Sequence, residues 1–271
     1  MKIVILGGTG MLGSKVGKYF TEKYGCDNIL ISHRPEKEIT YTDNTFCYDV
    51  LTCDTMYVPD CDYLINCIGM IKPRCVKWQE PNTVFINSYF PWYIANDCEY
   101  RGIRMIHITT DCVYSGIDGS YTENSVKDAK DLYGKSKALG EPDNCMVLRT
   151  SIIGEELYNK VSLVEWAKSQ KGKSVFGYTN HLWNGITTQQ YAAVCDAIIK
   201  DNVWTSELIH IFSNKYISKL TLLSLLNEKF DLDLAITPTE ADVRIDRTLY
   251  TNNKLNYFLN MPNIEDQIKD M

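Results

Sequence analysis

Tyr133 and Lys137 stand four residues apart in the segment LYGKSKALGE. On a helix, this spacing places both side chains on one face. A lysine beside a tyrosine favours the phenolate form, which lowers the phenol pKa and suits the hydroxyl for exchanging a proton with a carbonyl group. The same spacing recurs in two other pairs, which begin at Tyr19 and Tyr250. The chemistry therefore depends on which pair the neighbouring elements position beside a cofactor and a substrate.

A short strand and a glycine-rich turn open the chain. Ile3–Leu6 is a β-branched apolar run, and three glycines follow with the spacing G-x-x-G-x-x-G before an amphipathic helical pattern. The first glycine permits a tight turn, the second lets the backbone approach a pyrophosphate, and the third lets helix pack on strand. The helix start then presents unpaired N–H groups to the phosphates, so the pattern predicts dinucleotide binding. The residues expected to contact the cofactor here are Gly7, Thr9, Gly10, Met11, Leu12 and Gly13.

The end of the second expected strand, Asn28–Ser32, indicates which dinucleotide binds. His33 and Arg34 follow it, and no Asp or Glu occurs between Ile29 and Pro35. A carboxylate at this place holds the ribose 2′-hydroxyl of NAD, whereas an arginine suits the 2′-phosphate of NADP. The sequence therefore favours NADP, and a solvated loop charge is the alternative for Arg34.

Two later strand ends complete the expected cofactor site. Asp49, with Val50 after it, follows the third strand, where a carboxylate reaches an adenine amino group; structural capping is an equal alternative for Asp49. Cys67, Ile68 and Gly69 follow the fourth strand in the segment NCIG. We expect this loop of small residues to border the pyrophosphate and the nicotinamide.

Strand and helix patterns alternate through the first half of the chain. This alternation predicts an α/β fold of the Rossmann type, a doubly wound parallel sheet with its ligand at the carboxyl ends of the strands. Besides the two strands above, the expected strands are Thr45–Tyr48, Tyr63–Ile68, Arg104–Ile108 and Met146–Leu148. The expected helices are Thr83–Tyr100, Leu132–Leu139, Leu163–Ser169, Gln189–Ile199 and Leu220–Lys229.

The alternation of strand and helix patterns changes after Arg149, where turn and aromatic residues become frequent. We therefore expect an NADP-binding Rossmann domain in residues 1–150. Residues 151–271 are expected to form mainly a substrate-binding lobe, with a crossover back into the sheet.

Composition narrows the class of protein. The 271 residues are 45% hydrophobic and 23% charged with a net charge of −6 and no long basic run, which gives nucleic-acid binding no electrostatic support. None of the ten cysteines forms a Cys-x-x-Cys pair, so we expect reduced thiols and no metal site. The opening apolar run is too short for a signal peptide, and no window reaches eighteen apolar residues. We expect a cytoplasmic protein without membrane contact, and a homodimer is left open.

The context of Tyr133 selects it among the three tyrosine–lysine pairs. The strand ending in HITTDCVYSG places Thr110 at its carboxyl end, 23 residues before Tyr133. With the glycine loop, these residues resemble the extended short-chain dehydrogenase/reductase family along essentially the whole chain. The resemblance implies that Thr110 hydrogen-bonds the substrate oxygen, Tyr133 exchanges its proton, and Lys137 holds the tyrosine and the nicotinamide ribose. Hydride arriving at a carbonyl carbon creates an alkoxide, which independently calls for two nearby donors.

Further segments are similar to the dTDP-4-dehydrorhamnose reductase group within that family. They are TTDCVYSG, YTENS, LYGKSKALGE, LRTSIIG and DRTL. The resemblance implies NADPH-dependent reduction of the 4-keto group of a nucleotide-linked 6-deoxysugar. Asp111, Trp183, Asn184 and Arg247 are the candidate substrate-binding residues, because an arginine fork fits a pyrophosphate and an aromatic face suits a sugar or base.

Cys112 departs from that group, which has an aromatic residue at this place. Enzymes similar to GDP-fucose synthase and the plant rhamnose epimerase/reductases carry a cysteine two residues after the catalytic Ser/Thr. The resemblance implies an alternative, a bifunctional 3,5-epimerase/4-reductase of a UDP-, dTDP- or GDP-linked 4-keto-6-deoxysugar. Such a reaction needs a base and an acid on opposite faces of the sugar, with His181 as the partner of Cys112. A small buried cysteine and a loop histidine are the structural alternatives.

Two other functions stay open at the level of sequence. The regulatory subunit of methionine adenosyltransferase resembles the same group, so a non-catalytic NADP-binding subunit is one alternative. A sugar-nucleotide 4-epimerase is another, and it would retain its cofactor without net oxidation of NADPH.

Overall fold

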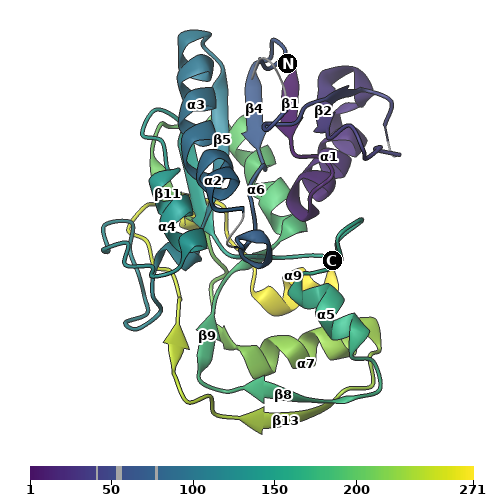
Figure 1. Cartoon of the computed structure of the whole chain (residues 1–271), viewed down its shortest axis with the longest axis vertical. Helices are drawn as coiled ribbons and strands as arrows, with labels where there is room; N and C mark the ends of the chain where they lie inside the picture. Colours follow the sequence, from purple (N-terminus) through teal and green to yellow (C-terminus); the bar gives the residue numbers. More distant parts are fainter. Residues whose placement is uncertain (41, 53–56, 77–78) are drawn as a thin grey trace.

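A parallel sheet dominates the upper part of the molecule (Figure 1). The computed structural model describes residues 1–40, 42–52, 57–76 and 79–271, and within these the sheet has seven strands in the order β11-β6-β5-β4-β1-β2-β3. The strands are β1 (Ile3–Leu6), β2 (Ile29–His33), β3 (Thr45–Cys47), β4 (Tyr63–Asn66), β5 (Arg104–Thr110), β6 (Met146–Thr150) and β11 (Leu208–His210). The prediction of a doubly wound parallel α/β sheet is confirmed.

Helices cover both faces of this sheet, which explains why its strands are apolar throughout. In β1, Ile3 and Ile5 pack on one face against α1 and α6, while Val4 and Leu6 pack on the other face against α3. Successive residues of a strand point to opposite faces, so each face receives an unbroken apolar layer. The helices beside the sheet are α1 (Met11–Tyr24), α3 (Phe90–Tyr100), α4 (Leu132–Leu139) and α6 (Thr188–Lys200).

The segment predicted as one helix over Thr83–Tyr100 is longer and interrupted. It consists of α2 (Glu80–Val84), a π-helical turn (Phe85–Tyr89) and α3 (Phe90–Tyr100). Pro91 has no N–H to donate to the carbonyl of Asn87, and its ring crowds that carbonyl, so the helix widens just before it. The freed carbonyl faces the end of α4, where a Cβ added to Gly140 would lie 1.7 Å from it.

Several strand ends differ from the sequence prediction. The second strand runs one residue further, to His33, because His33 pairs with Cys47. The fourth ends at Asn66 instead of Ile68, since the Asn66 side chain accepts a hydrogen bond from the Ile68 backbone and turns the chain. The fifth continues to Thr110, because β6 pairs with it as far as Thr150.

A smaller lobe lies below the carboxyl ends of the strands (Figure 1). Its short strands are β7 (Ile152–Ile153), β8 (Ser174–Tyr178), β9 (His181–Trp183), β10 (Ile186–Thr187), β12 (Ile217–Ser218), β13 (Ala235–Thr239) and β14 (Ile245–Asp246). Its helices are α5 (Leu163–Ser169), α7 (Lys219–Phe230) and α9 (Ile264–Lys269), whereas α8 (Leu255–Phe258) contributes Leu255 to the core beneath the large sheet. A separate apolar core, which includes Val164, Trp183, Leu222 and Ile264, holds the lobe together.

The chain returns from this lobe to the large sheet. After β10, helix α6 packs against α1, and β11 pairs in parallel with β6. Residues after 150 therefore build the lobe and also the last edge of the sheet. Within the described part of the chain, every helix is too short or too polar to cross a membrane.

Candidate active site

The glycine loop joins β1 to α1 through a tight turn. Gly7 has a φ of +84°, a conformation that favours glycine, and its N–H donates to the Ser32 hydroxyl at 2.8 Å. A Cβ on Gly13 would lie 2.1 Å from the Gly7 carbonyl oxygen, so only glycine lets the helix approach the turn this closely. Helix α1 begins at Met11 without an acidic residue in its first turn. Its positive end is therefore free to receive a phosphate.

The loop after β4 lies between the glycine loop and α4. A Cβ on Gly7 would lie 3.2 Å from the Cys67 backbone, and a Cβ on Gly69 would lie 3.7 Å from the Lys137 ammonium. Burial raises the pKa of the Cys67 thiol, and Lys137 opposes that shift. The predicted cofactor loop and the predicted catalytic lysine are thus neighbours.

Asn87 fixes that loop against α4, a role that the sequence did not reveal. Its side chain is fully buried, accepts a hydrogen bond from the Met70 N–H at 2.8 Å and donates to the Met70 carbonyl at 3.0 Å. The same amide donates to the Ser136 hydroxyl at 3.1 Å. Asn87 therefore sets the distance between the loop after β4 and the helix that carries Tyr133 and Lys137.

Asp49 and Val50 follow β3, as the sequence predicted for the adenine end. Val50 is buried, and one carboxylate oxygen of Asp49 accepts a hydrogen bond from the Leu51 N–H at 3.0 Å. The capping role that sequence left open for Asp49 is thus present. Contact with adenine stays a prediction for both residues.

Three cations gather beyond the end of β2. Burial lowers the pKa of Lys37, and the charges of Arg34 and Arg74 lower it further, so the three groups lie within electrostatic range of one another. His33 donates from Nδ1 to the Arg34 carbonyl oxygen at 3.0 Å, and the Arg34 Nε lies 3.4 Å from Glu36. The sequence predicted Arg34 for this site but not Lys37 or Arg74.

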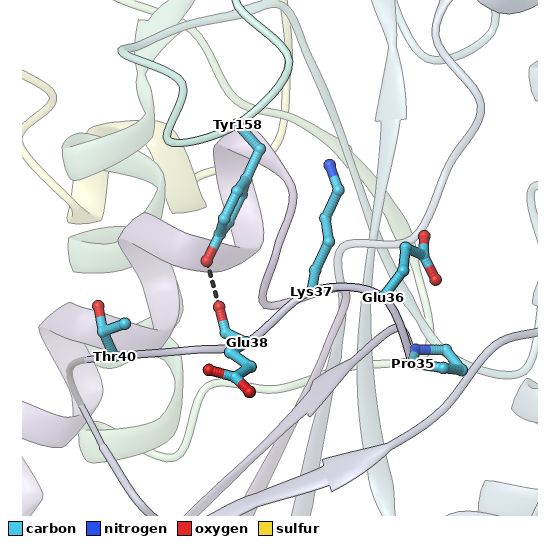
Figure 2. Close-up of a pocket in the computed structure, with 6 residues that line it drawn as sticks. All are labelled: Pro35, Glu36, Lys37, Glu38, Thr40 and Tyr158. Carbon is cyan, nitrogen blue, oxygen red and sulfur yellow. Dashed lines mark hydrogen bonds between the residues drawn. The ribbon is translucent and has the colours of Figure 1, made fainter.

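Figure 2 shows the pocket beside these cations, which is lined by Pro35, Glu36, Lys37, Glu38, Thr40 and Tyr158. Tyr158 comes from the lobe side and donates a hydrogen bond to the Glu38 carbonyl oxygen. The Lys37 ammonium lies 4.8 Å from the centroid of the Tyr158 ring and donates to Asn159 at 3.0 Å. The lobe thus contacts the loop expected to bind the adenosine part of the cofactor.

Helix α4 brings the predicted catalytic pair to the end of β5. The Asp131 carboxylate caps the helix by accepting a hydrogen bond from the Gly134 N–H at 2.9 Å. A Cβ on Gly134 would lie 2.3 Å from the Cys112 carbonyl oxygen. This glycine lets α4 pack directly on the turn after Thr110, and that contact brings the tyrosine beside the threonine.

The environment of Tyr133 differs from the sequence expectation. Burial raises the pKa of its phenol, Cys112 and Asp111 raise it further, and a hydrogen bond with Thr110 only partly opposes the rise. The predicted lowering of the phenol pKa by the neighbouring lysine is therefore wrong, because burial is the largest influence on this pKa and Lys137 is not among the main ones. Tyr133 is a neutral phenol at physiological pH, and so a proton donor.

The side chain of Lys137 reaches the backbone of β5. Its ammonium donates to the Ile108 carbonyl oxygen at 2.9 Å. Burial lowers the pKa of Lys137 to about 8, although Glu141 and Cys67 oppose the shift. The lysine keeps most of its charge at neutral pH and is ready to bind a further oxygen.

The turn after β5, Asp111–Val113, carries two more predicted residues. The Thr110 hydroxyl accepts from the Cys112 N–H at 3.1 Å and donates to the Asp111 carboxylate at 3.2 Å. Burial raises the pKa of Asp111, which Arg247 and Lys219 oppose. Burial and the Asp111 charge raise the pKa of Cys112 to about 12. Its thiol is therefore protonated at neutral pH.

His181 does not serve as the partner of Cys112. It lies on β9, donates from Nε2 to the Val243 carbonyl oxygen at 3.1 Å, and packs 4.8 Å from the Tyr178 ring centroid. The pairing proposed from sequence is wrong, because the register of β9 with β14 turns this side chain toward the residues before β14. Two lobe cations lie within electrostatic range of Cys112: Arg247, a predicted residue, and Lys219, which the sequence did not single out.

Asn184 and Arg247, two of the predicted substrate-binding residues, both bind the backbone of the protein. Asn184 is buried and binds both backbone groups of Leu249, at 2.8 and 2.9 Å, so its amide holds the lobe together instead of facing a substrate. Arg247 donates to the carbonyl oxygens of Tyr114 and Ser115, yet its charge acts on Asp111.

The chain matches the sequence model of the RmlD substrate binding domain family over residues 1–245. It belongs to this family. The match covers nine tenths of the chain, so the sheet, the glycine loop and most of the lobe fall within it.

Individual relatives of this family member are distant. Methionine adenosyltransferase 2 subunit beta of Rattus norvegicus is 26% identical over 145 residues, 52% of this chain and 41% of that protein. The chain thus matches less than half of that relative's length. The dTDP-4-dehydrorhamnose reductase of Clostridium acetobutylicum superposes with a TM-score of 0.75 at 19% identity, over 100% of this chain and 98% of the other. That of Bacillus anthracis, in complex with NADP, gives 0.74 at 16% identity, over 99% and 97%. These likenesses establish the fold.

The other two tyrosine–lysine pairs have different surroundings, and the Tyr250 backbone accepts a hydrogen bond from His210 at the end of β11. Tyr19 and Lys23 on α1 both donate to the Asp196 carboxylate on α6, together with Tyr24. This pair therefore joins two helices of this RmlD-family chain. The side chain of Tyr250 is exposed.

Proposed function

We propose that the chain is an NADPH-dependent reductase of the 4-keto group of a nucleotide-linked 4-keto-6-deoxyhexose. The observation that carries this proposal is the pairing of a protonated Tyr133 with Thr110 at the carboxyl end of β5, next to the loop that borders Lys137. Two hydroxyl donors at one point are what a carbonyl oxygen needs as it gains negative charge.

The residues of the chain suit each part of the reaction. NADPH supplies the hydride when it is bound at the glycine loop. Tyr133 gives its proton to the oxygen, Thr110 donates a hydrogen bond to the same oxygen, and Lys137 binds a ribose hydroxyl near Gly69. The lysine charge also lowers the cost of transient phenolate, which burial alone would make high.

The cofactor end supports NADP over NAD. Burial lowers the pKa of Lys37, and the charges of Arg34 and Arg74 lower it further, although Glu36 and Glu156 oppose the shift. A 2′-phosphate would add negative charge beside these three cations, and a guanidinium binds it bidentately. The Bacillus anthracis relative, which holds NADP, supports the same assignment.

The test is to incubate the protein with NADPH and either dTDP- or UDP-4-keto-6-deoxyglucose, to follow NADPH oxidation, and to identify the product by NMR. We expect a 6-deoxyhexose with a new hydroxyl at C4. The matched control is Tyr133→Phe, which keeps the ring and removes the proton donor. Absence of turnover with either substrate would contradict the proposal.

A non-catalytic subunit is the second candidate, and the similarity to methionine adenosyltransferase 2 subunit beta favours it. Such a protein would bind NADPH without oxidising it and would associate with a methionine adenosyltransferase. Turnover that Tyr133→Phe abolishes would exclude this candidate.

The 3,5-epimerase/4-reductase alternative is disfavoured, because the Cys112 thiol is protonated and His181 is hydrogen-bonded to the Val243 carbonyl oxygen.

A further inference from the structure

Lys219 is a lobe residue whose ammonium has no hydrogen-bond acceptor and no ion-pair partner in the described part of the chain. It is the first residue of α7, behind the N-cap Ser218, and its ammonium lies 5.2 Å from the centroid of the Trp183 ring. Across residues 1–40, 42–52, 57–76 and 79–271, no hydrogen bond or ion pair reaches this ammonium. A partly buried ammonium without acceptors is costly, so its three donors are free for a ligand.

The position of Lys219 is firmly held. Trp183 is only 3% exposed, and a Cβ on Gly185 would lie 2.3 Å from its ring. The backbone of Gly185 therefore packs directly against the indole. The lysine ammonium lies over this ring, and the start of α7 fixes the lysine backbone. The ammonium is therefore presented by rigid elements and not by a mobile loop.

The charges around Lys219 place it at the reacting end of the site. Asp111 and Cys112 attract it, and Arg247 repels it. The Asp111 carboxylate already accepts a hydrogen bond from Thr110, and the Arg247 charge acts on it more strongly than the Lys219 charge does. Arg247 and Lys219 thus share the single negative charge of Asp111. One positive charge is left without a matching negative charge beside Asp111 and Cys112, the two residues that follow Thr110.

We propose that Lys219 binds an oxygen of the hexose from the lobe side, opposite the Thr110 and Tyr133 hydroxyls, and so selects the sugar. The proximity to Asp111 and Cys112 favours the sugar over the nucleotide diphosphate, because those residues directly follow Thr110. This inference rests on the proposed function. It assigns Lys219 as a specificity residue, since its donors reach the substrate and not the hydride.

The test compares Lys219→Met with wild type by calorimetry, using dTDP-glucose, dTDP and NADPH as separate ligands, with UDP-glucose and UDP as a second series. Methionine keeps a stem on the Trp183 ring and removes the ammonium. We expect dTDP-glucose or UDP-glucose to bind about tenfold or more weakly, since one charge-assisted hydrogen bond is lost. Binding of the matching nucleoside diphosphate and of NADPH should change less than about twofold.

Lys215→Met is the matched control, because Lys215 is exposed in the same lobe just before β12 and should leave all affinities unchanged. An equal loss for dTDP and dTDP-glucose would overturn the proposal and make Lys219 a phosphate ligand. Unchanged binding of all ligands would overturn it in favour of packing. The binding measurement does not depend on turnover. If wild type bound dTDP-glucose but oxidised no NADPH, the reductase proposal would be refuted, and the calorimetry would still test the role of Lys219.

Discussion

The Lys137 ammonium donates to the Ile108 carbonyl oxygen, two residues before Thr110 on the same strand. This bond ties the helix that carries the tyrosine to the strand that carries the threonine. Tyr133 and Thr110, the two donors proposed for the substrate oxygen, are therefore linked through this bond between α4 and β5. The pair is thus positioned by backbone contacts and not by side chains alone.

Tyr133→Phe should lower the rate of keto reduction by at least ~10² and leave NADPH affinity nearly unchanged, because it removes the proton donor alone. Steady-state kinetics and NADPH titration measure the two effects. Tyr250→Phe is the control, since the Tyr250 side chain is exposed. If Tyr250→Phe lowered the reduction rate and Tyr133→Phe did not, the choice of Tyr133 as the proton donor would be wrong.

Arg34→Asp should weaken NADPH far more than NADH. Loss of one charge-assisted phosphate contact costs about 1.5–3 kcal/mol, roughly ten- to over a hundredfold in affinity. Lys37→Met should act in the same direction, because Lys37 and Arg34 belong to one cluster. Equal losses for both cofactors, measured by fluorescence titration, would argue against a 2′-phosphate site.

The pKa of Lys137, lowered to about 8 by burial, predicts a pH dependence of stability. Between that value and the unfolded value of about 10.4, the unfolded chain binds more protons, so the free energy of unfolding should rise with pH. Below pH ~8 the buried ammonium costs stability in full. Lys137→Met should therefore raise stability at pH 7 by about 2 kcal/mol and flatten this rise. Urea unfolding at several pH values checks it, and parallel curves for the two proteins would contradict it.

Gly134→Ala should impair catalysis without touching a catalytic side chain. The added Cβ would lie 2.3 Å from the Cys112 carbonyl oxygen and 2.4 Å from the Ala129 Cβ, so α4 must move away from the turn after β5. We expect a loss of roughly tenfold or more in kcat, because misplacement of the donor by a fraction of an ångström suffices. Lys135→Ala, an exposed change on the same helix, is the control. Wild-type kcat in Gly134→Ala would show that this contact is dispensable.

Asp196→Ala should destabilise the fold by about 2 kcal/mol, because it removes the acceptor of hydrogen bonds from Tyr19, Lys23 and Tyr24. The exposed position of Lys23 limits its share. Turnover of the folded variant should match wild type, as α1 and α6 meet away from the strand ends. Asp201→Ala, at the exposed end of α6, is the control, and denaturant unfolding measures the difference.

The fold was predictable because its signals are local. Four-residue apolar runs such as Ile3–Leu6 mark strands buried on both faces, and the glycine spacing marks the turn at their carboxyl edge. The interruption at Asn87 depends on Pro91, a signal that was present in the sequence but outweighed by the amphipathic pattern.

The chemistry of the site was less predictable, since it depends on contacts between distant segments. The lysine spacing suggested a lowered phenol pKa at Tyr133, whereas burial by the surrounding loops raises it. Lys219 meets Cys112 only because α7 begins beside the end of β5, more than a hundred residues earlier in the chain. His181 turns away because of its strand register, which no short motif encodes.

The pairing of β11 with β6 has a consequence for biosynthesis. Until residues 208–210 have been made, β6 is an apolar strand with one unpaired edge, and such edges template aggregation. During synthesis this edge of the sheet therefore stays exposed while the first part of the lobe, from β7 to β10, and helix α6 are translated. A fragment ending near residue 150 should consequently precipitate or recruit chaperones, although it contains the glycine loop, Thr110, Tyr133 and Lys137.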